Sequence, residues 1–310
     1  MRTTFELRKL APSDRGAVVS IGVFDGIHLG HRAILAANAR TAAELGAESS
    51  VVTFRRHPKK VLLGRAPKTL TSLEHRLELF RELGVEHAVA LSFTENLRAL
   101  SVRDFVEQVA VQGLAVRRFV LGFDSKFGRD REGTPELLRE LGFEVEIVPE
   151  VLVAGRPVSS TAIREAVELG DLAGAERMLG RRVSVLGRVV RGRQLGREIG
   201  FPTANLDLHH ELHPPPGVYA VRAEHVREDG GRTAYGGVCN IGFRPTVQNE
   251  APTSPLVEVH LFDFGGDLYG ERLEVAFAAL LRQERRFENL GELTAQIARD
   301  ADDARRVLGG

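Results

Sequence analysis

The sequence predicts a two-part α/β protein, in which a doubly wound parallel-sheet domain precedes a small antiparallel β-barrel with a terminal helix. The length of 310 residues fits two domains of about 100–200 residues each. Up to Gly180, short apolar segments alternate with amphipathic helical patterns, which is typical of a parallel sheet covered on both faces. After Gly180, strand-like segments follow one another between turn formers, which indicates a small barrel. We therefore expect domains at residues 1–182 and 183–310.

In the first half, helix signals separate the expected strands. Leu29–Leu45 reads as a helix that ends at Gly46. Further helices begin at Thr71-Ser72-Leu73-Glu74, which has capping-box form, at Ser101, and at Thr134-Pro135, a cap followed by a first-turn proline. The expected strands are Ala17–Val23, Ser50–Phe54, His87–Ser92, Phe119–Leu121 and Glu144–Val148.

In the second half, glycine-rich turns such as Asp229-Gly230-Gly231 and Gly265-Gly266-Asp267 separate the strand-like segments. The expected strands are Val183–Val190, Val218–Val221, Gly236–Ile241, Leu256–Phe262 and Leu273–Phe277. A final helix has apolar residues near one face: Leu290, Leu293, Ile297, Ala301, Ala304 and Leu308.

The composition excludes several classes of protein. Equal numbers of basic and acidic residues, 42 of each, disfavour long nucleic acids as partners. The one cysteine, Cys239, excludes an internal disulfide, and its apolar neighbours favour a small buried side chain over a catalytic thiol. Because the N-terminus has no signal region and no segment approaches the roughly 20 apolar residues of a membrane span, we expect a cytoplasmic protein without a membrane partner. The sequence leaves the oligomeric state open.

A candidate phosphate site follows the first expected strand. Asp25-Gly26-Ile27-His28-Leu29-Gly30-His31 opens the first helix, and the carboxyl end of a parallel sheet is where such folds bind ligands. A helix N-terminus suits phosphate, and the two imidazoles can donate hydrogen bonds to the oxygens of a phosphorus centre as it gains charge. Alternatively, His28 and His31 only cap and line the helix start. A metal site is less favoured, because a third ligand is missing.

The segment from Gly22 to His31 resembles the HxGH nucleotidyltransferase superfamily, and specifically the bacterial bifunctional riboflavin kinase/FAD synthetase family. Ser159-Ser160-Thr161-Ala162-Ile163-Arg164 is similar to the second motif of that superfamily, although alone it reads as a helix cap with a solvated arginine. The resemblance implies that the following residues bind ATP, with the two histidines catalytic: Gly22, Phe24, Gly26, His28, His31, Ser159, Ser160, Thr161 and Arg164.

Two further segments resemble the family with one departure each. Val52–Pro58 is similar to TFxPHP with Arg56 in place of a proline, and Leu121–Gly128 is similar to GxDFxFG with Ser125 in place of an aromatic residue. The resemblance implies that His57 and Asp124 bind the flavin, while the loss of the aromatic residue at Ser125 leaves open the contacts to the flavin ring or the local packing. Neither a GxxxxGK[ST] loop nor a KMSKS-like segment is present in the sequence.

A second candidate phosphate site lies between Gly192 and Asn205. Gly192, Gly196 and Gly200 indicate a loop that can approach phosphate, and the side-chain oxygens of Thr203 and Asn205 share one side of an extended segment. Hydroxyl and amide oxygens are ligands that Mg²⁺ accepts. Composition alone favours a surface loop.

The stretch Gly200–Asn205 resembles the GFPTAN signature of riboflavin kinases. Pro216–Tyr219, Asn240–Thr246 and Leu281–Phe287 are similar to the PxGVY, NxGxRPT and LRxExxF segments of the same family. The resemblance implies that ATP is bound by Gly192, Gly196, Thr203 and Asn205, and Mg²⁺ by Thr203 and Asn205.

A candidate general base lies on the strand Val257–Leu261, where Glu258 and His260 share one face. Phosphorylation of an alcohol needs a base near the hydroxyl, and the resemblance places it at Glu258. It also implies that Arg282 binds the flavin. The alternatives are a solvated face of a sheet and a surface arginine.

The resemblance covers nearly the whole chain and implies two reactions. Riboflavin and ATP give FMN and ADP, and FMN and ATP then give FAD and pyrophosphate. Two other interpretations stay open at this point: an enzyme with one live activity, because of Arg56 and Ser125, and a flavin- or nucleotide-binding module without catalysis.

Overall fold

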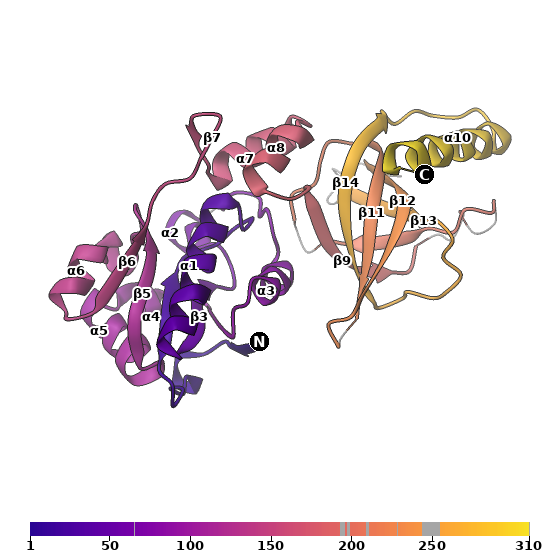
Figure 1. Cartoon of the computed structure of the whole chain (residues 1–310). Helices are drawn as coiled ribbons and strands as arrows, with labels where there is room; N and C mark the ends of the chain where they lie inside the picture. Colours follow the sequence, from indigo (N-terminus) through magenta and orange to yellow (C-terminus); the bar gives the residue numbers. More distant parts are fainter. Residues whose placement is uncertain are drawn as a thin grey trace. The chain divides into compact units, whose positions relative to one another are not determined.

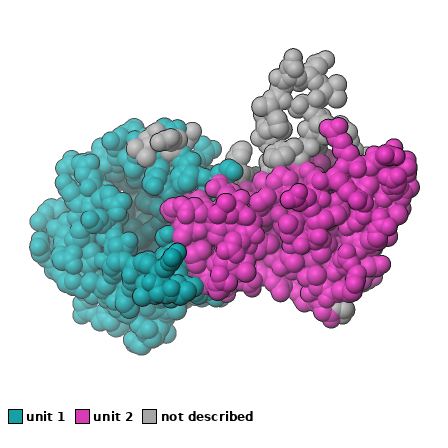
Figure 2. All heavy atoms as spheres, turned by 90° about the horizontal axis from the view of Figure 1, so that it is seen from above, with its two compact units in different colours: residues 1–160 teal, residues 161–310 magenta. Residues whose placement is uncertain are grey.

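The structure, a computed structural model, describes residues 1–64, 66–192, 196, 199–208, 211–227, 229–243 and 255–309. Contacts divide the chain into two compact units, residues 1–160 and 161–310 (Figure 2). Each unit has its own sheet and its own apolar core. Among the described residues, none of the helices is long and apolar enough to cross a membrane.

The first unit is built on a six-stranded sheet with the order β1-β4-β3-β2-β5-β6, in which all pairs are parallel, as the sequence predicts. A two-stranded hairpin of β7 (Leu152–Val153) and β8 (Arg156–Pro157) follows the sheet. The strand β1 was not predicted, because three residues with an exposed arginine carry no periodic signal. The sheet strands are β1 (Arg2–Thr4), β2 (Ala17–Ile21), β3 (Glu48–Phe54), β4 (His87–Leu91), β5 (Val116–Gly122) and β6 (Glu144–Val148).

Helices pack on both faces of this sheet (Figure 1). Successive strand residues point to opposite faces, so Val19 and Phe119 join the core under α5 and α6, while Val18 and Val120 join the core under α1. A π-helical turn, Glu107–Gly113, extends α5. The α-helices are α1 (Leu29–Leu45), α2 (Lys59–Leu63), α3 (Leu73–Glu82), α4 (Glu95–Ala99), α5 (Val102–Val106) and α6 (Pro135–Glu140).

The start of α3 differs from the expected capping box. The N-cap is Ser72, whose hydroxyl accepts from the backbone N–H of His75 at 3.1 Å. Thr71 instead contacts Asp25, so the capping-box reading of Thr71 with Glu74 was wrong. The Thr71 hydroxyl instead helps to hold the turn that carries the candidate phosphate site, and Ser72 forms the N-cap of α3.

The second unit begins with α7 (Ser160–Glu168), whose first residue belongs to the first unit, and α8 (Leu172–Leu179), and continues into a closed antiparallel barrel. The barrel order is β10-β13-β12-β11-β14-β9, closed by pairing of β9 with β10. The sequence predicted the barrel but treated β10 only as an extended segment. The strands are β9 (Ser184–Val190), β10 (Ala204–Asp207), β11 (Gly217–Val226), β12 (Arg232–Phe243), β13 (Pro255–Leu261) and β14 (Arg272–Arg282).

The terminal helix α10 (Leu290–Leu308) packs on β11, β12 and β14. Ala301 and Ala304 are buried against Val218 and Val238 of the barrel, which confirms that part of the predicted apolar face. Leu290 was wrongly counted on that face: it is 52% exposed, because it is the first residue of the helix.

Candidate active sites

A cavity of about 340 Å³ lies in the first unit at the carboxyl ends of β2 and β5. The chain passes from β2 to β3 on one side, whereas β5 lies on the other side of β2, so this is the topological switch point of the sheet. Predicted site residues from three segments line the cavity: Gly22, Phe24, His28, His31, Asp124, Ser159 and Ser160.

The two histidines lie against one another. Their ring centroids are 3.7 Å apart with planes inclined by 20°, and the Phe24 ring meets His31 edge-on at 5.2 Å. His28 caps α1, since its Nδ1 accepts from the backbone N–H of His31 at 3.4 Å. Burial, the imidazole of His28 and the guanidinium of Arg76 lower the pKa of His31 well below its usual value. At neutral pH His31 is therefore uncharged, with one N–H to donate.

The turn that carries the histidines has strained backbone angles. Phe24 has φ +53° and Ile27 has φ +40°, values that bulky residues rarely adopt, while Gly26 has φ +82°. The carboxylate of Asp25 accepts from the backbone N–H of Thr71 at 3.1 Å, and the Thr71 hydroxyl accepts from the N–H of Gly26 at 3.0 Å. These contacts hold Asp25 and Gly26 in the loop before α3.

The second superfamily-like motif meets the first at this cavity. Ser160 Oγ donates to the backbone carbonyl of Asp25 at 2.9 Å, which joins two segments 135 positions apart. Ser159 and Ser160 both line the cavity. Thr161 and Arg164 follow on α7 and belong to the second unit, so their part in ATP binding stays a prediction.

The two expected flavin residues of this unit lie in different places. Asp124 lines the cavity beside Ser125 and Phe123. His57 is not among the lining residues; its Nδ1 accepts from the backbone N–H of Lys59 at the start of α2. Phe123, which sequence reasoning passed over, is 52% exposed at the cavity.

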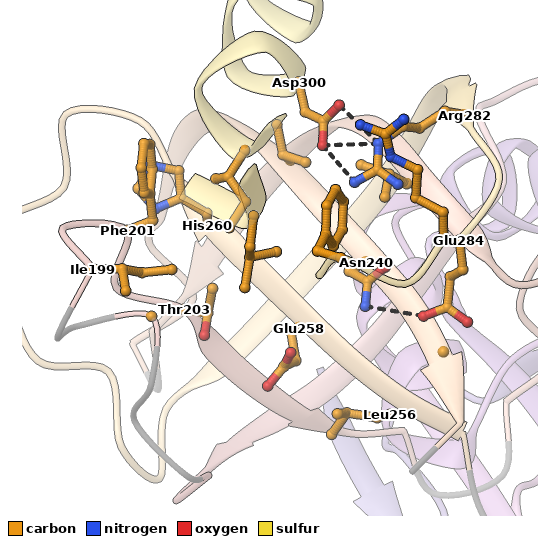
Figure 3. A pocket seen from close by; sticks show the side chains of 18 of the residues that line it. Ile199, Phe201, Thr203, Asn240, Leu256, Glu258, His260, Arg282, Glu284 and Asp300 are labelled. Atoms are coloured by element: carbon orange, nitrogen blue, oxygen red, sulfur yellow. Dashed lines mark hydrogen bonds and ion pairs between the residues drawn. The ribbon is translucent and has the colours of Figure 1, made fainter. Parts of the chain in front are cut away.

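A second cavity, of about 400 Å³, lies in the second unit between α10 and the outer face of the barrel strands (Figure 3). The strands β10 and β13 pair so that Asn205 lies opposite Glu258, and Glu258 lies opposite Asn240 of β12. Because these three positions are in register, one wall of the cavity carries an amide, a carboxylate and another amide. The predicted residues that line it are Gly196, Thr203, Asn205, Glu258, His260 and Arg282.

Glycines leave room for the predicted metal ligands. A Cβ on Gly192 would come within 2.3 Å of the Asn205 amide, and a Cβ on Gly196 would come within 3.3 Å of the Thr203 hydroxyl. A side chain at Gly192 would therefore displace Asn205. The rest of this loop's motif, Arg193–Leu195, Arg197 and Glu198, lies outside the described residues, as does Arg244–Thr246.

Thr203 also lines a second hollow of the barrel, of about 430 Å³. Along β13, Glu258 and His260 line the first cavity, whereas Val259 and Leu261 line the second hollow, in agreement with the predicted alternation. The hydroxyl-bearing residue thus stands between two spaces, each large enough for part of a nucleotide or a flavin.

Arg282 is held by a partner that sequence reasoning missed. Its guanidinium contacts both oxygens of Asp300 on α10, and Asp300 is 3% exposed. Gln296 also donates to Asp300, at 2.8 Å. An aspartate beside Ala301 on the apolar face of a helix was the available signal, since a buried carboxylate needs a partner.

Cys239 is fully buried behind this cavity, which confirms the expected small buried side chain. Burial and the neighbouring Glu258 carboxylate raise the pKa of its thiol, so it stays protonated and unreactive. Among the described residues there is no cluster of three or more His, Cys, Asp or Glu side chains arranged for a metal ion.

Paired imidazoles line a cavity at the switch point of a parallel sheet, and a hydroxyl, an amide and a carboxylate line a second cavity beside the barrel, an arrangement typical of a transferase with two separate sites. The family described as FAD synthetase matches residues 10–162, and the family described as riboflavin kinase matches residues 179–308. The chain belongs to the bifunctional riboflavin kinase/FMN adenylyltransferase family.

Curated relatives with that name match the chain over almost its full length. The protein from Pseudomonas fluorescens is 40% identical over 97% of this chain and 96% of its own. The protein from Escherichia coli K12 is 39% identical over 96% and 95%, and that from Bacillus subtilis 168 is 37% identical over 94% and 92%. These matches span both units.

A solved structure shares the fold of the whole chain. It is named as a macrolide-efflux protein from Streptococcus pneumoniae, is 30% identical, covers 98% of both chains and has a TM-score of 0.80. Its name differs from those of the curated relatives, which agree with both matching families.

Proposed function

We propose that the second unit phosphorylates riboflavin with ATP to give FMN and ADP, and that the first unit joins FMN to the adenylyl group of ATP to give FAD and pyrophosphate. The family membership and both site geometries support this proposal. Because both reactions consume ATP, the proposal includes a cytoplasmic location, with riboflavin, FMN and ATP as the small-molecule partners.

The observation that carries the kinase half is the convergence of Thr203, Asn205 and Glu258 on one cavity. The Glu258 carboxylate would take the proton of the riboflavin hydroxyl. The hydroxyl oxygen would then attack the γ-phosphorus of ATP as ADP leaves. The first cavity suits this transfer, because it brings the base and both oxygen-bearing side chains to one place where donor and acceptor would meet.

The residues present fit Mg²⁺. Thr203 and Asn205 offer neutral hard oxygens, and ATP phosphates would complete the ligand set of the ion. The glycines beside them leave these oxygens accessible. When bound, Mg²⁺ would neutralise phosphate charge during transfer. Thr203 and Asn205 would hold it, and Gly192 and Gly196 would let the nucleotide approach.

For adenylyl transfer, a phosphate oxygen of FMN attacks the α-phosphorus of ATP, a new phosphoanhydride bond forms, and pyrophosphate leaves. No covalent enzyme intermediate is required, so the protein supplies position and charge stabilisation. His28 and His31 would donate hydrogen bonds to the reacting phosphate. Ser159 would hold the nucleotide phosphates with its hydroxyl and Ser160 with its backbone N–H at the start of α7, because the hydroxyl hydrogen of Ser160 is donated to Asp25.

One incubation separates the proposal from its rivals. The pure protein is supplied with riboflavin, ATP and Mg²⁺, and the flavins are separated by chromatography. We expect FMN and then FAD. FMN alone would mean that the departures at Arg56 and Ser125 have disabled adenylylation, and a parallel incubation with FMN would check this. If neither FMN nor FAD forms, the chain would be a binding module without catalysis, and the proposal would be overturned.

A further inference from the structure

Arg76, on α3, is a buried cation outside the residues that line either cavity. Arg76 is 3% exposed, and arginine is almost never buried so deeply unless it is paired. Its Nη1 donates to the backbone carbonyl of Val23 at 2.6 Å and to Thr53 Oγ1 at 3.2 Å. Its Nη2 donates to the carbonyl of Phe54 at 2.9 Å. The guanidinium therefore bridges the ends of two neighbouring strands.

These acceptors belong to the loops that carry the adenylyl-transfer site. Val23 comes directly before Phe24, the residue with φ +53°. Phe54 ends β3 and leads into the segment that contains His57. Thr53 Oγ1 also donates to the Val23 carbonyl, at 3.0 Å. Two donors thus hold the one peptide group from which the strained turn begins, and such strain persists only where the surroundings hold it.

The held peptide leads directly to the catalytic histidine. The Phe24 ring is packed edge-on between His31, at 5.2 Å, and Phe80, at 5.7 Å. Phe80 lies four residues after Arg76, so both project from the same face of α3. The helix therefore fixes Phe24 twice, through its backbone and through its ring, and Phe24 in turn forms one wall for His31.

We propose that Arg76 is a positioning residue for adenylyl transfer, which acts by anchoring the Val23 and Phe54 carbonyls and thereby placing Phe24 and His31. This inference rests on the proposed function of the first unit. Arg76 does not touch the reacting phosphates; its effect passes through the turn.

The charge of Arg76 gives the proposal a second readout. It is one cause of the lowered pKa of His31, beside burial and His28. Other charged groups around the same cavity are Asp124 and Glu150. Removal of the Arg76 charge should raise the pKa of His31, because one of the groups that oppose its protonation is lost.

The competing explanation is a purely structural arginine that joins strands and fills space. Arg76→Met keeps most of the volume and loses the charge and the donors. Arg76→Lys keeps the charge and donates from one nitrogen. Arg76→Gln keeps donors without charge. Arg98→Met on α4, with a side chain that is 46% exposed and an exposed partner, Glu95, is the matched control.

The experiment measures FAD formation from FMN and FMN formation from riboflavin in the full chain, with thermal unfolding of each variant. We expect Arg76→Met to lower kcat for FAD formation by about 10²-fold, the scale of a displacement of about 1 Å, with little change in KM. FMN formation should be unchanged. Arg76→Lys should restore most of the rate, and Arg98→Met should match the parent.

The pKa of His31 is read from its ring Cε1–H signal by NMR, assigned with His31→Ala. We expect it to be higher in Arg76→Met and in Arg76→Gln than in the parent, and close to the parent in Arg76→Lys. If Arg76→Met is too unstable to assay, Arg76→Gln takes its place. Equal rates and equal His31 pKa values in the Lys and the neutral variants would overturn the proposal. A parent protein that makes no FAD would instead refute the proposed function itself.

Discussion

Arg282 and Asp300 form a two-contact ion pair at the barrel cavity, in which Nε and Nη2 of the arginine reach the carboxylate at 2.9 and 2.8 Å (Figure 3). Asp300 lies on α10, and Arg282 ends β14. The pair therefore links the terminal helix to the strand and fixes the plane of the guanidinium. An arginine held in this way has less side-chain entropy to lose when a ligand binds.

Asp300→Asn should raise KM for riboflavin several-fold while kcat changes less, because Arg282 loses its charged partner but Glu258 is untouched. The unfolding temperature should also fall, since breaking one side of a buried pair costs about 3–5 kcal/mol. Steady-state kinetics and thermal unfolding measure both effects. Asp303→Asn on the same helix is the exposed control. An unchanged KM would show that Arg282 does not contact the flavin.

Glu258→Ala should slow FMN formation by about 10²–10⁴-fold, the range for a lost general base. FAD formation from supplied FMN should persist, because that site lies in the other unit. Glu224→Gln, on β11 and paired with Arg232, serves as a control. Kinase turnover that survives in the Glu258 variant would disprove the assignment of the base.

Replacement of His28 or His31 by Ala should cripple FAD formation and spare riboflavin phosphorylation. Each imidazole is expected to contribute about 10²–10³-fold, by analogy with donors in oxyanion holes. Both activities are measured on the same preparation. An equal loss of both, in a folded protein, would point to one shared site.

Fragments test the proposed boundary between residues 182 and 183. A fragment of residues 183–310 should fold and make FMN, because the barrel closes within it. Residues 1–182 should make FAD from FMN, whereas residues 1–160 should do so less well if Thr161 and Arg164 bind ATP. Circular dichroism shows whether each fragment is folded, and the FMN and FAD assays show which activity it keeps. A folded 183–310 fragment without kinase activity, next to an active 161–310 fragment, would show that the kinase needs α7 and α8.

Low pH should reduce the stability of the first unit, because the imidazole of His87 is held in its neutral form in the folded protein. Burial, and then the Arg2 guanidinium, lower the pKa of this imidazole from 6.5 to about 4. Above pH 6.5 the ring is neutral in both states and its contribution is complete. As pH falls from 6.5 towards 4, the unfolded chain takes up a proton that the folded chain does not, so the free energy of unfolding falls by roughly 3 kcal/mol.

Hydrogen exchange gives a local measurement of this effect. His87 contacts Arg2 and Thr4 of β1, so the amides of residues 2–4 should exchange faster at pH 5 than at pH 7 after correction for intrinsic rates. His87→Gln should remove most of the pH dependence. A parent protein with equal protection of β1 at both pH values would contradict the prediction.

The sequence predicted best the elements whose ends are marked by capping or turn residues. The bounds of α1 agree because Gly46 adopts φ +60° at its end, and α6 starts at Pro135 after the Thr134 cap. The strands β11 and β14 exceed the predicted apolar segments, because their outer ends carry polar residues that alternate outward. β10 has four residues and is recognisable only through its partners.

Several residues predicted from motifs lie at the two cavities, whereas residues that hold them in place were not predicted. Thr203, Glu258, His28 and His31 line the cavities in the structure. Arg76 was missed, because a single charged residue in a helix looks solvent-facing until its contacts with distant segments are known. Asp300 was missed although its place beside Ala301 on the apolar face of the last helix was a local sign of burial.

The edge strands of the two sheets affect whether the protein aggregates at high concentration. Every barrel strand has a partner on both sides, so the described part of the second unit presents no open strand to another molecule. The parallel sheet ends at β1, with three residues, and at β6, where Glu144 and Glu146 carry charge. Short or charged borders discourage strands of neighbouring molecules from adding on. This protein should therefore resist β-type aggregation at high concentration, and loss of Glu144 and Glu146 should weaken that resistance.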